Sequence, residues 1–188
     1  MFHLLDQEHF SHLEKEKLKL GIQIIISESY KLILIYLLAY LLNCIVPTLI
    51  AHLTFFILRQ VCFGYHFNNL IICLATSIIA FPITIKYLAD YYSIIPTFLL
   101  YIIFIIILVF IYKLAPKGTE KHPIINQHHK KYLRRKMAFR VFIIVGIFCI
   151  STFEIKVFIA YGALLESLML LSQSIKGEYF YENELDEC

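Results

Sequence analysis

The feature of this sequence that most limits its fold is the run 94–111, which contains no acidic residue, lysine or arginine. Four further stretches are also strongly apolar, and they cover residues 32–58, 70–85, 141–153 and 157–171. The chain as a whole is 60% hydrophobic and only 16% charged, whereas an average soluble domain is about 45–50% apolar and about 25% charged. A chain of 188 residues cannot hide so much apolar surface inside itself. The sequence therefore excludes a soluble monomer and predicts an all-α protein whose helices cross a membrane.

The distribution of lysine and arginine predicts how the chain is oriented. Nine of these residues and a single acid, Glu120, fall within residues 113–140. The positive-inside rule places such a segment in the cytoplasm. Four lysines within residues 1–31 place the N-terminus there as well. An even number of membrane crossings is therefore expected between these two basic segments.

The number of crossings depends on the stretch 32–58, which is long for a single crossing and is interrupted by Asn43 and Pro47. We expect this stretch to form two crossings, either as a tight hairpin or as a pair of short helices in a locally thinned bilayer. The last two apolar stretches form a second pair, with a turn expected at residues 154–156. The total is about six membrane helices, a polytopic arrangement with both termini in the cytoplasm.

The sequence divides into three parts. Residues 1–30 have apolar positions at helical spacing around a group of lysines, which predicts an amphipathic helix on the cytoplasmic face of the membrane. An ordinary solvated helix packed on the rest of the protein fits that pattern equally well. Residues 31–172 form the membrane domain, with the basic loop 113–140 on its cytoplasmic side. Residues 173–188 form an acidic cytoplasmic tail.

His66 and Cys73 are the polar pair with the most specific chemical use. A thiolate is a nucleophile, and an imidazole that takes the thiol proton keeps it ionised. On one continuous helix the two side chains would be about 10 Å apart along the axis, so a catalytic pair requires a helix that begins between them. Asn68 and Asn69 are suitable N-cap residues. Cys73 would then lie about one turn into the helix, where the helix dipole favours a thiolate.

Other interpretations of the cysteines and histidines stay open. A cysteine is commonly a small buried hydrophobe, and a histidine at a membrane interface can contact lipid headgroups. Cys62 is a second candidate nucleophile because it lies four residues before His66. Packing explains Cys44 and Cys149, which lie within apolar stretches.

Two further sets of polar residues require an explanation. Glu166 lies inside the last apolar stretch, and an acid there is either a functional group or a side chain that reaches water near a helix end. The basic segment contains three histidines without a cysteine or acid at metal-ligand spacing, so we expect no metal site and no cofactor. Its charge is explained better by anionic lipid or an acidic partner than by nucleic acid.

Together these residues resemble the AgrB family of bacterial quorum-sensing peptidases. The resemblance covers nearly the whole chain, and its core is Arg59, Gly64, His66 and Cys73 at the family's spacing. Further similar segments are 32–40, 53–56 and the Ala115-Pro116 pair before the lysine-rich loop. The stretches 61–63 and 67–69 depart from the family pattern, and we expect them to affect peptide specificity rather than the pair itself.

The resemblance implies that the protein is a cysteine endopeptidase of the bacterial cell membrane, cutting the propeptide AgrD and closing its N-terminal product into a thiolactone. His66 would be the catalytic histidine and Cys73 the catalytic cysteine, with Arg59 and Gly64 required for activity. The resemblance also implies a homodimer. The family's propeptide has an acidic tail, which gives the basic loop a partner. The basic side chains proposed to bind it are those of Lys130, Lys131, Arg134 and Arg135. The alternative is a non-enzymatic transporter or a subunit of a signalling complex, which leaves the Cys/His pair without a task.

Overall fold

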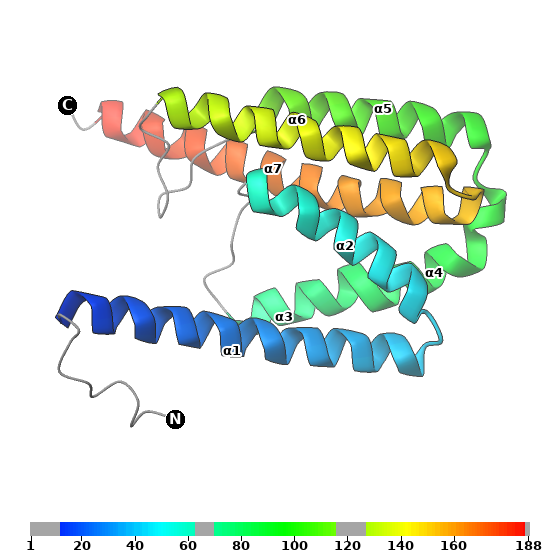
Figure 1. The fold of residues 1–188 in the computed structure, drawn as a ribbon, viewed down its shortest axis with the longest axis horizontal. Helices are drawn as coiled ribbons and strands as arrows, with labels where there is room; N and C mark the ends of the chain where they lie inside the picture. The colour runs from blue at the N-terminus through cyan, green and yellow to red at the C-terminus, as the bar shows by residue number, and fades with distance from the viewer. Residues whose placement is uncertain (1–11, 63–69, 116–126, 187–188) are drawn as a thin grey trace.

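The computed structural model describes residues 12–62, 70–115 and 127–186, and these form helices and no strands. In chain order the elements are α1 (His12–Leu41), α2 (Ile45–Cys62), α3 (Leu70–Ile78), η2 (Ile79–Ile83), α4 (Thr84–Tyr91), η3 (Tyr92–Ile94), α5 (Thr97–Leu114), α6 (Gln127–Ile150) and α7 (Phe153–Asp186). The helices run back and forth along one long axis (Figure 1). The start of α1, the end of α2, the start of α3 and the end of α7 consequently all lie toward the same end, at the left of Figure 1.

Four helical segments in the described part of the chain are long and apolar enough to cross a membrane. They are Ile45–Cys62, Ile71–Ile94, Thr97–Leu114 and Phe153–Ser174. Large apolar side chains remain exposed on the described surface. For example, the exposed fraction is 76% for Phe98 and 89% for Ile150. Such an apolar surface is unfavourable in contact with water. The all-α, membrane-spanning class is therefore confirmed. The count of six and the orientation stay predictions.

The predicted hairpin within residues 32–58 is confirmed as a break between two helices. α1 ends at Leu41 in a Schellman motif, in which the backbone N–H of Cys44 donates to the carbonyl of Ala39 at 2.9 Å. Asn43 occupies the left-handed position of this motif, with φ 54°, a conformation that asparagine tolerates better than most residues. Pro47 is the third residue of α2 and does not interrupt it, because the first N–H groups of a helix have no partner within it.

Residues 1–30 were predicted to form an amphipathic helix of their own. In the structure, the described part of this segment belongs to the same helix as the start of the first apolar stretch. α1 runs without a break from His12 to Leu41 and so joins the two. Residues 1–11 lie outside the described part of the chain.

A π-helical segment separates α3 from α4 and surrounds Pro82. Proline has no backbone N–H, so a helix that contains it leaves a carbonyl to be satisfied in another way. Two hydroxyl groups donate to carbonyls within this segment. Tyr161 donates to the carbonyl of Ala80 at 2.6 Å, and Thr84 donates to that of Ile79 at 2.8 Å. Side-chain donors of this kind make irregular backbone tolerable at membrane depth.

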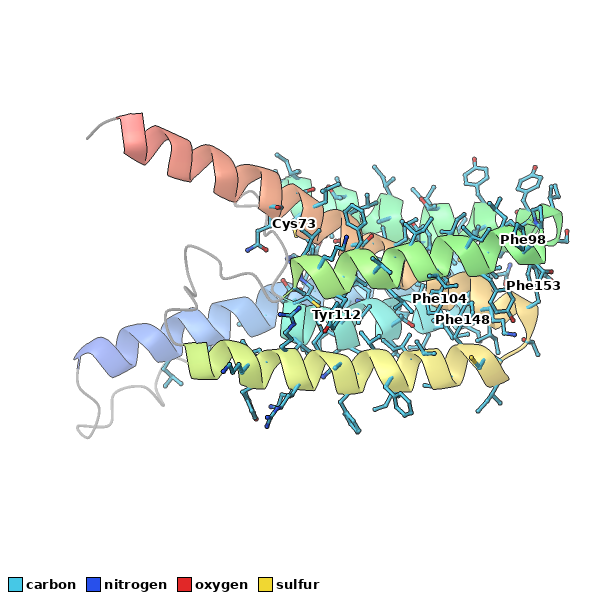
Figure 2. All side chains as sticks on the ribbon, turned by 90° about the horizontal axis from the view of Figure 1, so that it is seen from above. Cys73, Phe98, Phe104, Tyr112, Phe148 and Phe153 are labelled. Carbon is cyan, nitrogen blue, oxygen red and sulfur yellow. The ribbon has the colours of Figure 1, made fainter. Side chains whose placement is uncertain are left out.

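The core consists of two clusters that share α2 and α7. One cluster joins these two helices to α5 and α6, and at its centre the rings of Phe104 and Phe148 stack at 3.9 Å (Figure 2). The other joins them to α1 and the π segment. α2 and α7 approach closely at Gly162, where a Cβ would collide with the carbonyl oxygen of Ala51 and lie 3.0 Å from the Cβ of Thr54. Small residues are the usual means by which membrane helices pack this tightly.

The turn between α6 and α7 differs from the predicted one at residues 154–156. α6 ends at Ile150 and α7 begins at Phe153, so the turn is at Ser151 and Thr152. Glu154 lies in the first turn of α7, where a negative charge is favourable to the helix dipole. The segment 173–186, predicted as an acidic tail, continues α7 as a helix.

Candidate functional site

Cys73 is the fourth residue of α3, because that helix begins at Leu70. The predicted helix start and its N-cap residues fall within 63–69, outside the described part of the chain, and they stay a prediction. The side chain of Cys73 is partly exposed. Figure 2 shows it toward the same end of the bundle as Tyr112, and away from Phe98 and Phe153 at the other end.

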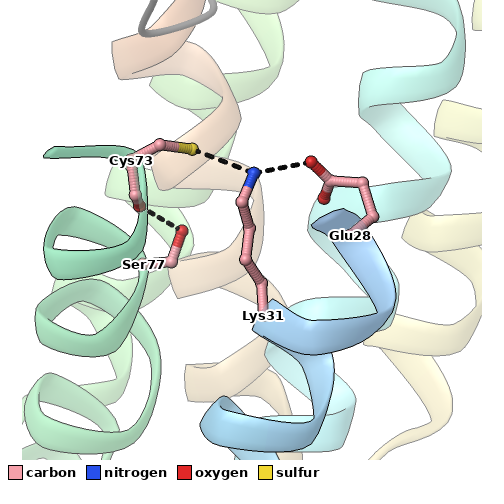
Figure 3. Close-up of polar contacts among 4 residues, drawn as sticks. All are labelled: Glu28, Lys31, Cys73 and Ser77. Carbon is pink, nitrogen blue, oxygen red and sulfur yellow. Dashed lines mark hydrogen bonds and ion pairs between the residues drawn. The ribbon is translucent and has the colours of Figure 1, made fainter. Parts of the chain in front are cut away.

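Two charged residues of α1 lie beside Cys73. The Nζ of Lys31 is 3.5 Å from the Sγ of Cys73 and 2.7 Å from Oε1 of Glu28, so the ammonium group lies between the sulfur and the carboxylate (Figure 3). The backbone carbonyl of Cys73 accepts a hydrogen bond of 2.8 Å from the hydroxyl of Ser77, one turn further along α3.

The charge state of Lys31 follows from this environment. Burial acts to lower the pKa of Lys31, but the hydrogen bond and charge of Glu28, together with the charge of Cys73, raise the pKa above its ordinary value. Lys31 therefore stays protonated throughout the range in which a thiol titrates.

His66 and Gly64, the other two residues of the predicted motif, lie outside the described part of the chain. The distance from His66 to Cys73 is therefore not among the structural observations, and the Cys/His pair stays a prediction.

Arg59 lies near the end of α2 and pairs with a buried acid of α7. Its Nη1 is 3.7 Å from Oε2 of Glu166, a separation that fits an ion pair better than a direct hydrogen bond. The guanidinium also lies over the ring of Phe55, at 5.4 Å from its centroid. Glu166 is 0% exposed, so the interpretation in which this acid reaches water is wrong. Its burial is offset by the positive charge of Arg59.

Cys62 is also fully buried, with 0% of its surface exposed. It lies within electrostatic range of the Glu166–Arg59 pair and of Arg140. Arg140 in turn donates to the backbone carbonyl of Ile57 at 2.7 Å, which fixes the last turns of α2 against α6. A peptide carbonyl cannot reach the sulfur of Cys62 without opening this packing, so the structure disfavours Cys62 as the competing nucleophile.

Three of the four basic residues predicted to bind an acidic partner are exposed on the first half of α6. They are Lys131, Arg134 and Arg135. The guanidinium of Arg134 lies over the ring of Tyr112 of α5, at 4.9 Å from its centroid. Lys130 belongs to the same helix, but its side chain lies outside the described residues.

The structure also describes Cys44 and Cys149, for which the sequence predicted a packing role. Cys44 is buried, and its thiol points to the carbonyl of Pro82 at 3.7 Å, so its predicted packing role is confirmed. Cys149 is exposed on α6, and a packing role within the chain is therefore wrong for it. Among the described residues, no group of three or more histidines, cysteines or acids could hold a metal ion.

Sequence reasoning missed Glu28 and Lys31 as neighbours of Cys73. Lys31 is 42 residues away in sequence, and the contact depends on how α1 packs on α3. The available signal was weak: Lys31 is the last charged residue before the first apolar stretch.

The antiparallel helices and the exposed apolar surface define a multispanning membrane protein, and a partly exposed cysteine toward one end of its helices is the candidate nucleophile. The family model described as Accessory gene regulator B matches residues 2–170, and the chain belongs to this family. Membership gives it a role in the accessory gene regulator system.

Individual relatives support the same assignment. The chain is 36% identical to the Accessory gene regulator protein B of Staphylococcus intermedius over 176 residues, which cover 93% of this chain and 92% of the relative. Identity to the protein of the same name from Staphylococcus lugdunensis is 27% over 169 residues, covering 90% and 88%. For Staphylococcus aureus (strain MRSA252) it is 28% over 172 residues, covering 90% and 89%. No solved structure matches the chain.

Proposed function

We propose that this protein is a membrane-embedded cysteine endopeptidase that cuts an AgrD-type propeptide and closes its N-terminal product into a thiolactone. The observation that carries the proposal is the position of Cys73, which is partly exposed in the first turn of α3 and lies 3.5 Å from an ammonium group. Reactive cysteines typically lie in partly exposed, electropositive surroundings, and the ammonium group beside Cys73 fits that description. Membership of the accessory gene regulator B family supports a processing role.

The first step of the proposed reaction forms an acyl-enzyme. The thiolate of Cys73 attacks the scissile carbonyl carbon and forms a C–S bond. His66, as its imidazolium, gives a proton to the leaving amine while the peptide C–N bond breaks. The C-terminal fragment departs, and the N-terminal part of the propeptide remains on Cys73 as a thioester.

The second step closes the ring. A cysteine of the propeptide passes its thiol proton to His66 and attacks the thioester carbonyl. The thiolactone forms, and Cys73 leaves as a thiolate, ready for another cycle. One thioester replaces another, so the exchange is nearly balanced in energy and water is the main competing nucleophile. An apolar membrane setting supports cyclisation because it keeps water away from the thioester.

We assign recognition of the acidic propeptide tail to the basic face of α6, with Lys131, Arg134 and Arg135 exposed there and Lys130 next to them in sequence. Arg59 supplies a further positive charge near the end of α2, and Gly64 is assigned a supporting role by the family motif. The proposal includes a homodimer in the bacterial cell membrane with both termini in the cytoplasm, where the amphipathic propeptide would also bind.

The proposal is tested by incubating the purified protein in liposomes with a synthetic propeptide and analysing the peptides by mass spectrometry. We expect the C-terminal fragment and an N-terminal product that is lighter by one water than the linear acid. Empty liposomes are the control. A propeptide that stays intact contradicts the enzyme and favours a transporter or a signalling subunit. A linear N-terminal product alone contradicts the cyclisation step.

A further inference from the structure

The ammonium group of Lys31 has a geometry that suits a role at Cys73. Its side chain is only 11% exposed, so water screens its charge less than it would on an open surface. An ammonium group carries three donors. One is directed to Glu28 at 2.7 Å and another to the sulfur of Cys73 at 3.5 Å (Figure 3).

We propose that Lys31 is a positioning residue that holds the Cys73 thiolate in place for attack, and that Glu28 orients the Lys31 ammonium. The inference rests on the proposed function, which makes Cys73 the nucleophile. Lys31 acts by its charge and does not carry the proton, which stays the task of His66. Among the described residues, the support for Cys73 therefore comes from α1.

Few other charged groups lie near Cys73 among the described residues. α3 packs against α1 and the π segment, and the π segment Ile79–Ile83 contains no titratable side chain. Within the described part of these elements, Lys31 is the titratable group that contacts Cys73, and Glu28 contacts Lys31. Glu28 is 57% exposed, and its carboxylate is directed to Lys31 rather than to the sulfur (Figure 3).

This arrangement also assigns a task to α1 beyond membrane binding. α1 brings Lys31 to α3 at the point where its charged half meets its apolar half. A movement of α1 along α3 by one helical turn, about 5.4 Å, would remove the ammonium from the sulfur. The docking of α1 thus completes the site.

The test measures how fast iodoacetamide alkylates Cys73 at pH 7, by peptide-resolved mass spectrometry of the full-length protein in liposomes, together with kcat and KM for propeptide cleavage. The variants are Lys31→Met, which keeps most of the side-chain length but removes the charge, and Lys31→Arg, which keeps the charge. Lys86→Met is the matched control, because Lys86 forms a similar lysine–carboxylate pair with Asp90 at 2.8 Å in α4. Each variant is first checked for an unchanged size-exclusion profile.

We expect Lys31→Met to slow alkylation of Cys73 at pH 7 by about tenfold, because the reacting sulfur is negatively charged and the variant lacks the cation that holds it. For propeptide cleavage at pH 7, kcat should fall in parallel for Lys31→Met alone, with KM unchanged. Lys31→Arg and Lys86→Met should keep the wild-type alkylation rate. Equal alkylation rates for wild type and Lys31→Met overturn the inference. A wild-type protein that cuts no propeptide contradicts the proposed function instead, since the alkylation rate is measured without propeptide.

Discussion

Replacing Cys73 by alanine is expected to abolish propeptide cleavage, a loss of about 10⁴-fold or more. Alanine has no nucleophile, so no acyl-enzyme forms and neither cutting nor ring closure follows. His66→Ala should have an effect of similar size, because the leaving amine then has no proton donor. Cleavage is measured as the amount of propeptide fragment released when each variant is co-expressed with the propeptide.

Cys62→Ala is the matched control for this prediction. Cys62 is a thiol at the end of α2 with no exposed surface, and its replacement removes one buried sulfur but no proposed reacting group. We expect cleavage to continue at close to the wild-type rate. Full processing by Cys73→Ala, or its loss in a well-folded Cys62→Ala variant, would contradict the assignment of the nucleophile.

Replacing Gly162 by alanine is expected to destabilise the fold by about 2–3 kcal/mol. The new Cβ would collide with the backbone carbonyl of Ala51, and a backbone atom cannot move aside as the end of a flexible side chain can. α2 and α7 must therefore separate, and both core clusters depend on these two helices. The measurement is the midpoint of thermal unfolding in detergent, followed by size-exclusion chromatography.

Gly146→Ala in α6 makes the same chemical change in open surroundings. A Cβ at Gly146 meets no described atom within 4 Å, and alanine is favoured over glycine in a helix by about 1 kcal/mol. We expect this variant to be as stable as the wild type or slightly more stable. Equal midpoints for the two alanine variants would show that the close approach of α2 and α7 at Gly162 is not required.

Much of the fold could be predicted from local sequence signals. Four of the apolar stretches overlap the candidate membrane helices, whereas 141–153 lies in α6, which is not one of the four. Asn43 marked the end of α1 because it tolerates a positive φ. The turn between α6 and α7 was predicted too far along the chain, because Glu154 was interpreted as a loop residue although it favours the first turn of a helix.

The candidate site was only partly predictable, for a physical reason. Cys73 could be selected from the chemistry of a thiol at a helix start, but its neighbours Lys31 and Glu28 come from α1 and reach it through tertiary packing. Glu166 was recognised as an unusual acid in an apolar stretch, whereas its pairing with Arg59 depends on the packing of α2 against α7. Neither contact has a local sequence signature.

The central claim is that Cys73 forms a thioester with the propeptide. It is tested most directly with a propeptide whose ring-forming cysteine is replaced by alanine, so that the second step cannot occur and the acyl-enzyme accumulates. The intact mass of the protein is measured after mixing, and the modified residue is located by proteolysis and peptide sequencing. The account predicts a protein heavier by the N-terminal propeptide fragment, with the adduct on Cys73. Release of the C-terminal fragment without an adduct, or an adduct on Cys62, would contradict it.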